Sequence, residues 1–278
     1  MPIMFNSLLS SIGIPLTDVI LLRHKDGRAA RGRTPYELWR DNRTGFELYQ
    51  SCQLVGNRSK FTRAPYWASF VVTPDGFTMF VGLYAAKYKG LLAEDTKQPH
   101  TDDIDRAGTC DMYDLEVDKR LVDLQGKLFI EWGAATRVWV QRADTQNKPI
   151  SEPRREFQEP EFPGFLNFRE PLSKVEKLPK IWVEILKNTV GVYLLTCPKT
   201  KEQYVGSACG EEGFWQRWMQ YAVTGHGGNI SLKSRERSDY QVSILEVAGS
   251  GSNTDEILKM ESRWKEKLQS REMGLNKN

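Results

Sequence analysis

Cysteine is scarce in this sequence, and its four cysteines form no recognisable motif. Cys52, Cys110, Cys197 and Cys209 include no Cys-x-x-Cys pair, and none has a histidine at the spacing of a zinc site. This spacing argues against a zinc site and against a disulfide framework. We therefore expect the cysteines to be reduced.

Long hydrophobic runs are also missing. No apolar run approaches the roughly 18 residues that a membrane-spanning helix needs. The first six residues lack the basic segment and apolar stretch of a secretory signal, so we expect a cytoplasmic protein with no membrane partner. Hydrophobic residues make up 40% and charged residues 27% of the chain, which indicates a globular protein.

The chain has little excess of either charge. Its 39 lysines and arginines exceed its 36 aspartates and glutamates by only three, too few to indicate a nucleic-acid partner. The whole surplus lies from Ser173 onward. A small positive bias there suits a phosphate partner, but it would suit many other surfaces equally.

The length of 278 residues favours two domains over one. Residues 144–171 contain five prolines, few aliphatic residues and no clear period, which indicates an irregular connector. We therefore place a first domain at 1–145, a linker at 146–172 and a second domain at 173–278.

The N-terminal part has the patterns of β-structure with a few helices. One hairpin is predicted over 67–84, around the turn Thr73–Gly76, and another over 128–141, around Gly133. Thr34, followed by proline and then by glutamate three residues on, predicts a helix start. We expect a small curled sheet or barrel with helices, and an α+β fold for the whole chain.

The C-terminal part predicts the order β-β-α-β-α, a three-stranded antiparallel sheet flanked by helices. Glycine and proline punctuation separates the apolar runs. Asn253 and Glu256 form a capping-box pattern at the start of the last helix. The five predicted elements are 191–196, 203–206, 212–223, 240–247 and 254–269.

Glu261 lies within the apolar stripe of the last predicted helix. A carboxylate there must be paired, protonated or bound to a cation, because an unpaired buried charge is costly. Mg²⁺ prefers such hard oxygen ligands. The alternative is a carboxylate at the edge of the buried face, reaching solvent or pairing with an arginine. The stripe itself consists of Ile257, Met260, Trp264 and Leu268.

Arg217 and Tyr221 are four residues apart on one surface of the short predicted helix. An arginine is expected where phosphate oxygens must be held in two directions, although a surface arginine over an aromatic ring explains the pair as well. Tyr193 and Tyr204 lie on the two strands before this helix. Strand tyrosines are usually packing residues.

Together these residues resemble a known family. Gly191-Val192-Tyr193 and, ten residues later, Tyr204-Val205-Gly206 are followed in order by Arg217, Tyr221, Glu261 and Asn276. The set resembles the GIY-YIG nuclease superfamily over about residues 191–276. Its two departures are valines in place of the isoleucine of each triplet, which are conservative on a strand.

The resemblance implies hydrolysis of a phosphodiester with one divalent metal ion, Mg²⁺ or Mn²⁺, held by Glu261. Tyr193 would orient or deprotonate the attacking water, a task for which an ordinary phenol is a poor base. Tyr221, the metal and Arg217 would lower that cost, and Arg217 would also neutralise the phosphoryl oxygens.

Two further roles follow from the same resemblance. Tyr204 would hydrogen-bond phosphate or water. Asn276 would fix the last turn of the chain or touch the phosphate.

Double-stranded DNA is the partner that the resemblance implies, and two basic segments suit its phosphates. The glycine-rich segment 225–229 precedes three cations, although a solvated loop explains them equally well. The segment 23–33 contains further lysine and arginine residues in a turn-like stretch. The candidate DNA-binding residues are Lys233, Arg235, Arg237, Arg28, Arg31 and Arg33.

We therefore hypothesise a restriction-like endonuclease whose first domain selects the DNA. An aromatic pocket in a β-barrel would read a flipped, modified base. The aromatic residues in question would otherwise fill the core; they are Tyr66, Trp67, Trp132 and Trp139. Alternatives are a repair or mobile-element nuclease and a DNA-binding protein without turnover. Cutting both strands would need a homodimer or two successive nicks.

Overall fold

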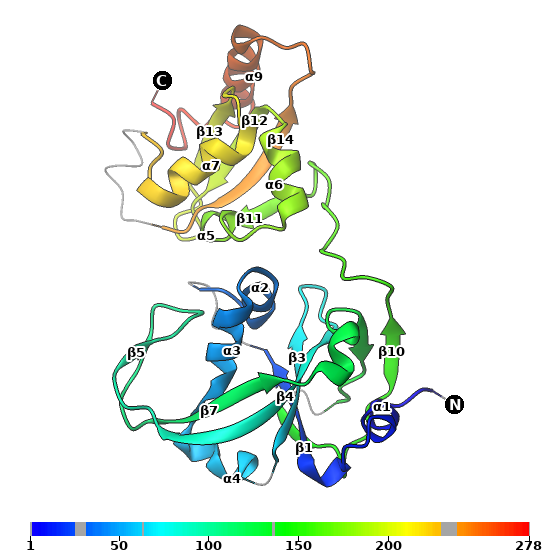
Figure 1. The fold of residues 1–278 in the computed structure, drawn as a ribbon. Coiled ribbons are helices and arrows are strands. Elements are labelled where there is room, and N and C mark those ends of the chain that lie inside the picture. The colour runs from blue at the N-terminus through cyan, green and yellow to red at the C-terminus, as the bar shows by residue number, and fades with distance from the viewer. Residues whose placement is uncertain (1, 26–31, 63, 135–136, 229–237, 278) are drawn as a thin grey trace. The chain divides into compact units, whose positions relative to one another are not determined.

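The computed structural model describes residues 2–25, 32–62, 64–134, 137–228 and 238–277. The fold is mixed α/β (Figure 1). The chain divides into two compact units, Met1–Gln158 and Glu159–Asn278.

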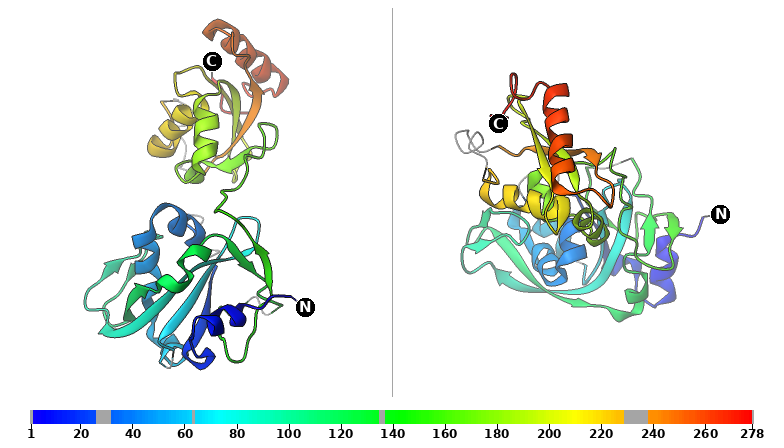
Figure 2. Two further views of the ribbon diagram at one scale, coloured as in Figure 1. Left: turned by 45° about the vertical axis from the view of Figure 1, so that its right-hand side comes forward. Right: turned by 90° about the horizontal axis from the view of Figure 1, so that it is seen from above.

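The N-terminal unit is built on a curled sheet in the form of a half-barrel (Figures 1 and 2). Its described strands run in the order β10-β8-β4-β3-β1-β9, and β7 and β2 extend it from β4. All pairs are antiparallel except β1 with β3. The strands are β1 (Val19–His24), β2 (Cys52–Leu54), β3 (Tyr66–Val72), β4 (Thr78–Leu91), β7 (Cys110–Val117), β8 (Leu128–Ile130), β9 (Val140–Arg142) and β10 (Ile150–Pro153).

Short elements complete this unit. β5 and β6 form a separate two-stranded ribbon. The bounds of these elements are α1 (Phe5–Ser11), α2 (Pro35–Asp41), α3 (Arg43–Ser51), α4 (Arg58–Phe61), β5 (Thr96–Lys97) and β6 (Ile104–Asp105), with 3-10 turns at Leu16–Asp18, Val55–Asn57 and Lys119–Leu124.

The local signals at 34–37 and 67–84 are confirmed. Thr34 accepts from the Glu37 backbone N–H while the Glu37 side chain accepts from the Thr34 N–H, a complete capping box with proline at the first helical position. β3 and β4 pair across the turn Thr73–Gly76.

The second predicted hairpin is wrong. β8 pairs with β4 and β10, whereas β9 pairs with β1 at the other side of the sheet. Trp132, two residues after β8, is buried in the core, and its indole N–H donates to the Val138 carbonyl at 3.0 Å. Tertiary packing, which the local turn signal does not contain, decides the partners of the two strands.

The core of this unit lies on both faces of the sheet. Along β1, Leu21 packs with α1 in one cluster, while Ile20 and Leu22 pack with Phe61 of α4 in another. Such alternation follows from the two-residue period of a strand. All six residues of β1 are buried, as expected for a strand covered on both faces.

The C-terminal unit has a sheet with the order β11-β14-β12-β13 and antiparallel pairing throughout. The predicted order β-β-α-β-α is present from residue 191 onward, and the Asn253–Glu256 capping box is formed. The bounds are β11 (Arg169–Pro171), α5 (Leu172–Val175), α6 (Lys180–Lys187), β12 (Gly191–Thr196), β13 (Gln203–Ala208), α7 (Gly213–Thr224), β14 (Gln241–Val247) and α9 (Thr254–Lys267).

The segment 146–172, predicted to be an irregular connector, contributes a short strand to each unit. β10 joins β8, and β11 adds a fourth strand to the sheet predicted to have three. Both strands have only three or four residues and contain proline and charge, so they carry no alternating apolar pattern.

Two layers of helix cover the C-terminal sheet. Residues of α5, α6 and α7 pack with Tyr193, Leu195 and Tyr204 on one face. α9 contacts β12 and β13 (Figure 2). In the part of the chain that the structure describes, no helix has the length and apolar character needed to cross a membrane.

Candidate active site

Three of the predicted site residues form one hydrogen-bonded cluster. The Tyr193 hydroxyl donates to the Tyr221 hydroxyl oxygen at 3.1 Å. Arg217 donates to both phenols, from Nε to Tyr193 at 3.2 Å and from Nη2 to Tyr221 at 3.3 Å. The three side chains therefore form a closed set of hydrogen bonds.

Glycines let this cluster close. A Cβ on Gly206, which pairs with Tyr193 across β12 and β13, would lie 2.5 Å from the Tyr193 hydroxyl oxygen. A Cβ on Gly227 would lie 2.7 Å from the Tyr221 ring. These distances leave no room for a side chain at either position.

Burial controls the protonation of the phenols. Tyr193 is fully buried and Tyr221 is 1% exposed. Burial raises the pKa of both phenols well above the ordinary value, and their mutual proximity raises that of Tyr221 further. Burial therefore favours the neutral form of both phenols.

Arg217 keeps an uncompensated charge. A guanidinium is not deprotonated in proteins at physiological pH, so Arg217 stays protonated. Its hydrogen-bond acceptors among the described residues are neutral oxygens, including the Gly227 carbonyl at 3.2 Å and Gln220 Oε1 at 3.0 Å. Within the described residues it has no carboxylate partner, which leaves its charge for an anion.

Glu261 is buried and paired. It is 8% exposed; the Ser207 hydroxyl donates to its Oε2, and Lys265 Nζ lies 2.7 Å from its Oε1. Lys265, one helical turn further along α9, is itself buried. The partner is thus a lysine, and neither solvent nor an arginine explains how this carboxylate is tolerated.

Ser207 and Lys265 were missed by sequence reasoning. Ser207 directly follows Tyr204-Val205-Gly206, and Lys265 stands four residues after Glu261, the spacing at which helical side chains meet. The four-residue spacing of Glu261 and Lys265 is visible in the sequence. The contact with Ser207 depends on how α9 lies on β13, which no local pattern specifies.

The Tyr193–Arg217–Tyr221 cluster and the Glu261–Lys265 pair lie on opposite faces of β13. Gly206 and Ser207 are neighbours on that strand, so their Cβ directions point to opposite faces. Tyr193 packs on Gly206, whereas Glu261 accepts from Ser207. In the described part of the chain, no hydrogen bond or ion pair joins Glu261 to Tyr193, Arg217 or Tyr221.

Asn276 holds the edge of β13. Its Oδ1 accepts from the Val205 N–H at 2.9 Å and its Nδ2 donates to the Val205 carbonyl at 2.8 Å. It is 1% exposed, and both amide atoms are used. Of the two roles expected, it fixes the last turn. Tyr204 is also buried, with its ring centroid 6.3 Å from that of Tyr221.

Most of the predicted DNA-binding cations fall outside the described residues; these are Arg28, Arg31, Lys233, Arg235 and Arg237. Arg33 is described and forms an ion pair with Asp41. Of the four aromatic residues considered for stacking, Trp67 and Trp132 are buried in the core and Tyr66 and Trp139 are partly buried.

A cysteine cluster in the N-terminal unit was also missed. One ligand atom each from Cys52, Asp105 and Cys110 lies within 4.8 Å of the others. Burial, together with Cys110 and Asp105 nearby, raises the pKa of the Cys52 thiol. The cysteines come from neighbouring strands, so sequence spacing does not reveal them.

Comparison with protein-family models, with curated proteins and with solved structures found no match to this chain.

Proposed function

We propose that this protein is a DNA endonuclease that hydrolyses phosphodiester bonds with one divalent metal ion. The observation that supports this most is Arg217, a charged guanidinium held by two buried phenols and without a carboxylate partner among the described residues. Such a group is suited to a phosphate, whose oxygens gain negative charge during hydrolysis.

The donors around Glu261 are compatible with Mg²⁺ or Mn²⁺. A carboxylate has about four lone-pair positions, and Lys265 and Ser207 use one each. Mg²⁺ typically takes one or two protein carboxylates and keeps several waters, so Glu261 alone is a sufficient protein ligand. When bound there, the metal would supply Lewis-acid stabilisation of the phosphoryl and leaving oxygens.

The other residues of the site and the N-terminal unit have separate roles. Arg217 binds a phosphate oxygen of the DNA, and Tyr221 holds the guanidinium in place. Tyr193 positions Tyr221 and Arg217 through its hydroxyl. The N-terminal unit selects the DNA, and a modified base is the selected feature.

A plasmid assay tests the proposal. Wild-type protein is incubated with unmodified and base-modified plasmids in Mg²⁺ or in EDTA, beside Glu261→Gln and Arg217→Ala. We expect cleavage of modified DNA by the wild type in Mg²⁺ only. The proposal fails if the wild type cuts neither DNA, or if Glu261→Gln cuts as fast as the wild type. Accumulation of nicked circular plasmid would indicate successive nicking, whereas direct formation of linear plasmid would indicate a homodimer.

One observation favours a second candidate, a DNA-binding protein without turnover. Glu261 already has an internal cation in Lys265 at 2.7 Å, which satisfies the buried carboxylate without a metal. This candidate predicts DNA binding that is equal in Mg²⁺ and in EDTA, and no nicked product in either.

A further inference from the structure

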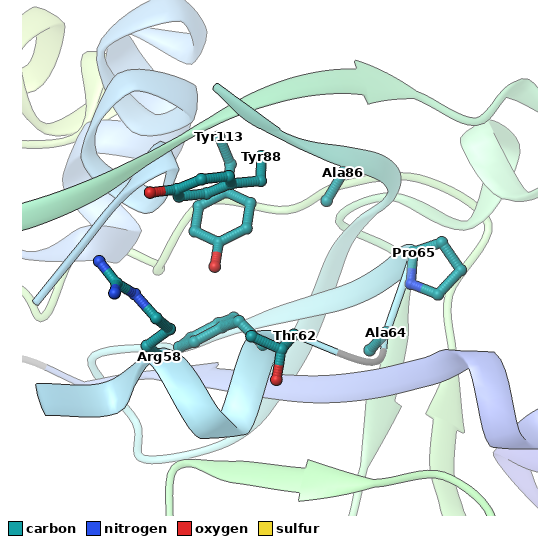
Figure 3. A pocket seen from close by; sticks show the side chains of 8 residues that line it. Arg58, Thr62, Ala64, Pro65, Ala86, Tyr88 and Tyr113 are labelled. Atoms are coloured by element: carbon teal, nitrogen blue, oxygen red, sulfur yellow. The ribbon is translucent and has the colours of Figure 1, made fainter. Parts of the chain in front are cut away.

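A cavity of about 580 Å³ opens in the N-terminal unit between α4 and the strands β4 and β7. Figure 3 shows Tyr88 and Tyr113 projecting from the strands toward Arg58, on α4, and Thr62, which directly follows this helix. Small residues, Ala64 and Ala86, line another part. Its volume falls within the roughly 300–1,000 Å³ of small-molecule sites.

The pocket has aromatic surfaces that are rigidly supported. The Tyr113 ring lies 5.6 Å from that of Tyr88 and 5.9 Å from that of Phe61, centroid to centroid. Trp67, fully buried, packs against both Phe61 and Tyr113, at 4.9 and 4.8 Å. Tyr88 is 51% exposed, so an aromatic face is available at the surface. Such surfaces favour a planar, unsaturated ring.

The polar end of the pocket is an arginine whose charge is neutralised. Arg58 donates to Asp111 through Nε at 2.8 Å and Nη2 at 2.6 Å, and Asp111 is fully buried. The Arg58 hydrogen bonds lower the pKa of the Asp111 carboxyl, which keeps it ionised. Among the described residues Arg58 Nη1 has no acceptor, so it is a free donor in a fixed position.

This pairing selects the chemistry of the occupant. A lone arginine would attract a phosphate, but a neutral Arg58–Asp111 pair favours an uncharged acceptor such as a ring carbonyl. A nucleobase combines that carbonyl with a stacking face. Because Ala64 and Ala86 have short side chains, the cavity also has space for a substituent on the ring.

We propose that this pocket receives a nucleobase turned out of the DNA duplex, stacked on the tyrosine rings with a carbonyl on Arg58 Nη1, and that it accommodates a ring substituent. The proposal rests on the proposed function in taking DNA as the ligand. Extrusion is required because a paired base is stacked within the duplex and cannot enter a cavity.

Binding is measured in EDTA with the full chain, so that cleavage does not interfere. The probes are short duplexes with one 5-hydroxymethylcytosine or an unmodified cytosine, next to 2-aminopurine, whose fluorescence rises when its neighbour unstacks. We expect tighter binding and a larger fluorescence rise for the modified duplex.

Two pocket variants and a matched control make the test specific. Tyr88→Ala removes the exposed stacking face, and Ala86→Trp fills the cavity while leaving the Arg58–Asp111 pair in place. Both should lower affinity for the modified duplex at least about tenfold, the loss of one base–aromatic stack. Phe77→Ala, at a residue equally exposed (52%) on the turn before β4, should bind as the wild type does.

The proposal is overturned if the variants bind the modified duplex as tightly as the wild type. It is also overturned if they weaken binding to all duplexes equally without a change in fluorescence, which indicates a backbone contact. Arg217→Ala separates the two proposals, since it should lose cleavage and keep modified-base binding. Cleavage that persists in Tyr88→Ala and Ala86→Trp, with unchanged preference, leaves the nuclease proposal intact and removes this one.

Discussion

Arg217 has a fixed position and no carboxylate partner among the described residues, so its substitution should affect cleavage more than folding. We expect Arg217→Ala to lower the single-turnover cleavage rate by about 100- to 1,000-fold, as the loss of one oriented donor to a transition state does. Arg217→Lys should recover little, because a compact ammonium lacks the planar fork of donors with which the guanidinium spans both phenols and a phosphate.

The control for this experiment is Arg263→Ala. Arg263 is an exposed arginine of α9, paired with Glu246 at 2.8 Å, and its removal should leave cleavage unchanged. Equal losses in the two variants would indicate a general effect of charge and contradict the role of Arg217.

The Glu261–Lys265 pair predicts a link between metal and stability. Lys265→Met leaves the buried carboxylate unpaired and should lower the free energy of unfolding in EDTA by about 3 kcal/mol. Mg²⁺ should restore part of this loss in the variant and change the wild type less. Urea unfolding in EDTA and in Mg²⁺ measures both effects.

A double variant serves as the reference for that measurement. Glu261→Gln combined with Lys265→Met removes both charges and should be more stable than Lys265→Met alone, with no response to Mg²⁺. An unchanged Lys265→Met in EDTA would show that the pair does not stabilise the fold.

At the scale of the strand, β13 depends on a glycine. Gly206→Ala places a methyl group 2.5 Å from the Tyr193 hydroxyl oxygen. We expect the free energy of unfolding to fall by about 2 kcal/mol and cleavage to fall with it, since the phenol must move. Gly251→Ala, where a Cβ meets no atom within 4 Å, is the matched control for circular dichroism melting and cleavage.

His24, the last residue of β1, should make the stability of the fold depend on pH. Burial lowers the pKa of His24 to about 4, so the folded chain holds this histidine neutral while the unfolded chain binds a proton below about 6.5. Stability from this group is therefore complete above about pH 6.5 and is lost as the pH falls toward 4, by about 2 kcal/mol at pH 5.

His24→Gln isolates this contribution. The other titrating groups are common to both proteins, so the difference in their free energies of unfolding between pH 7.5 and pH 5 reports His24. If the two proteins lose the same stability over this range, the buried histidine is not responsible.

Elements with a strong local signal could be predicted, and long-range pairings could not. The capping boxes at Thr34 and Asn253 fix helix starts from within four residues. By contrast, β8 and β9 are adjacent in the chain yet pair at different places in the sheet, because tertiary packing decides partners. β11 was missed because three residues cannot show a period.

The candidate site follows the same division. Arg217 and Tyr221 are four residues apart on one helix, a spacing that the sequence shows directly. Arg217 bonds to Tyr221 and to Tyr193 of the preceding strand. The pairing of Glu261 with Ser207 and the burial of Tyr193 depend on how α9 and α7 pack on the sheet. No sequence spacing contains that information.

At the scale of the whole molecule, each unit has its own core and its own sheet. We therefore expect fragments 1–158 and 159–278 to fold separately, each with one cooperative unfolding transition. The second fragment should cut modified and unmodified plasmids alike, whereas the first should bind modified duplexes without cutting. If fragment 159–278 alone prefers modified DNA, the N-terminal unit is not the part that selects the DNA.

The hydrogen bonds from Asn276 to both backbone groups of Val205 have a consequence for register. Because successive strand residues face opposite sides, a slip of β13 by one residue would turn Gly206 toward α9 and Ser207 toward the phenols. The Tyr193 hydroxyl would then meet a side chain, and Glu261 would lose its donor. Asn276 thus fixes the register of β13 and so keeps Gly206 beside the phenols and Ser207 beside Glu261.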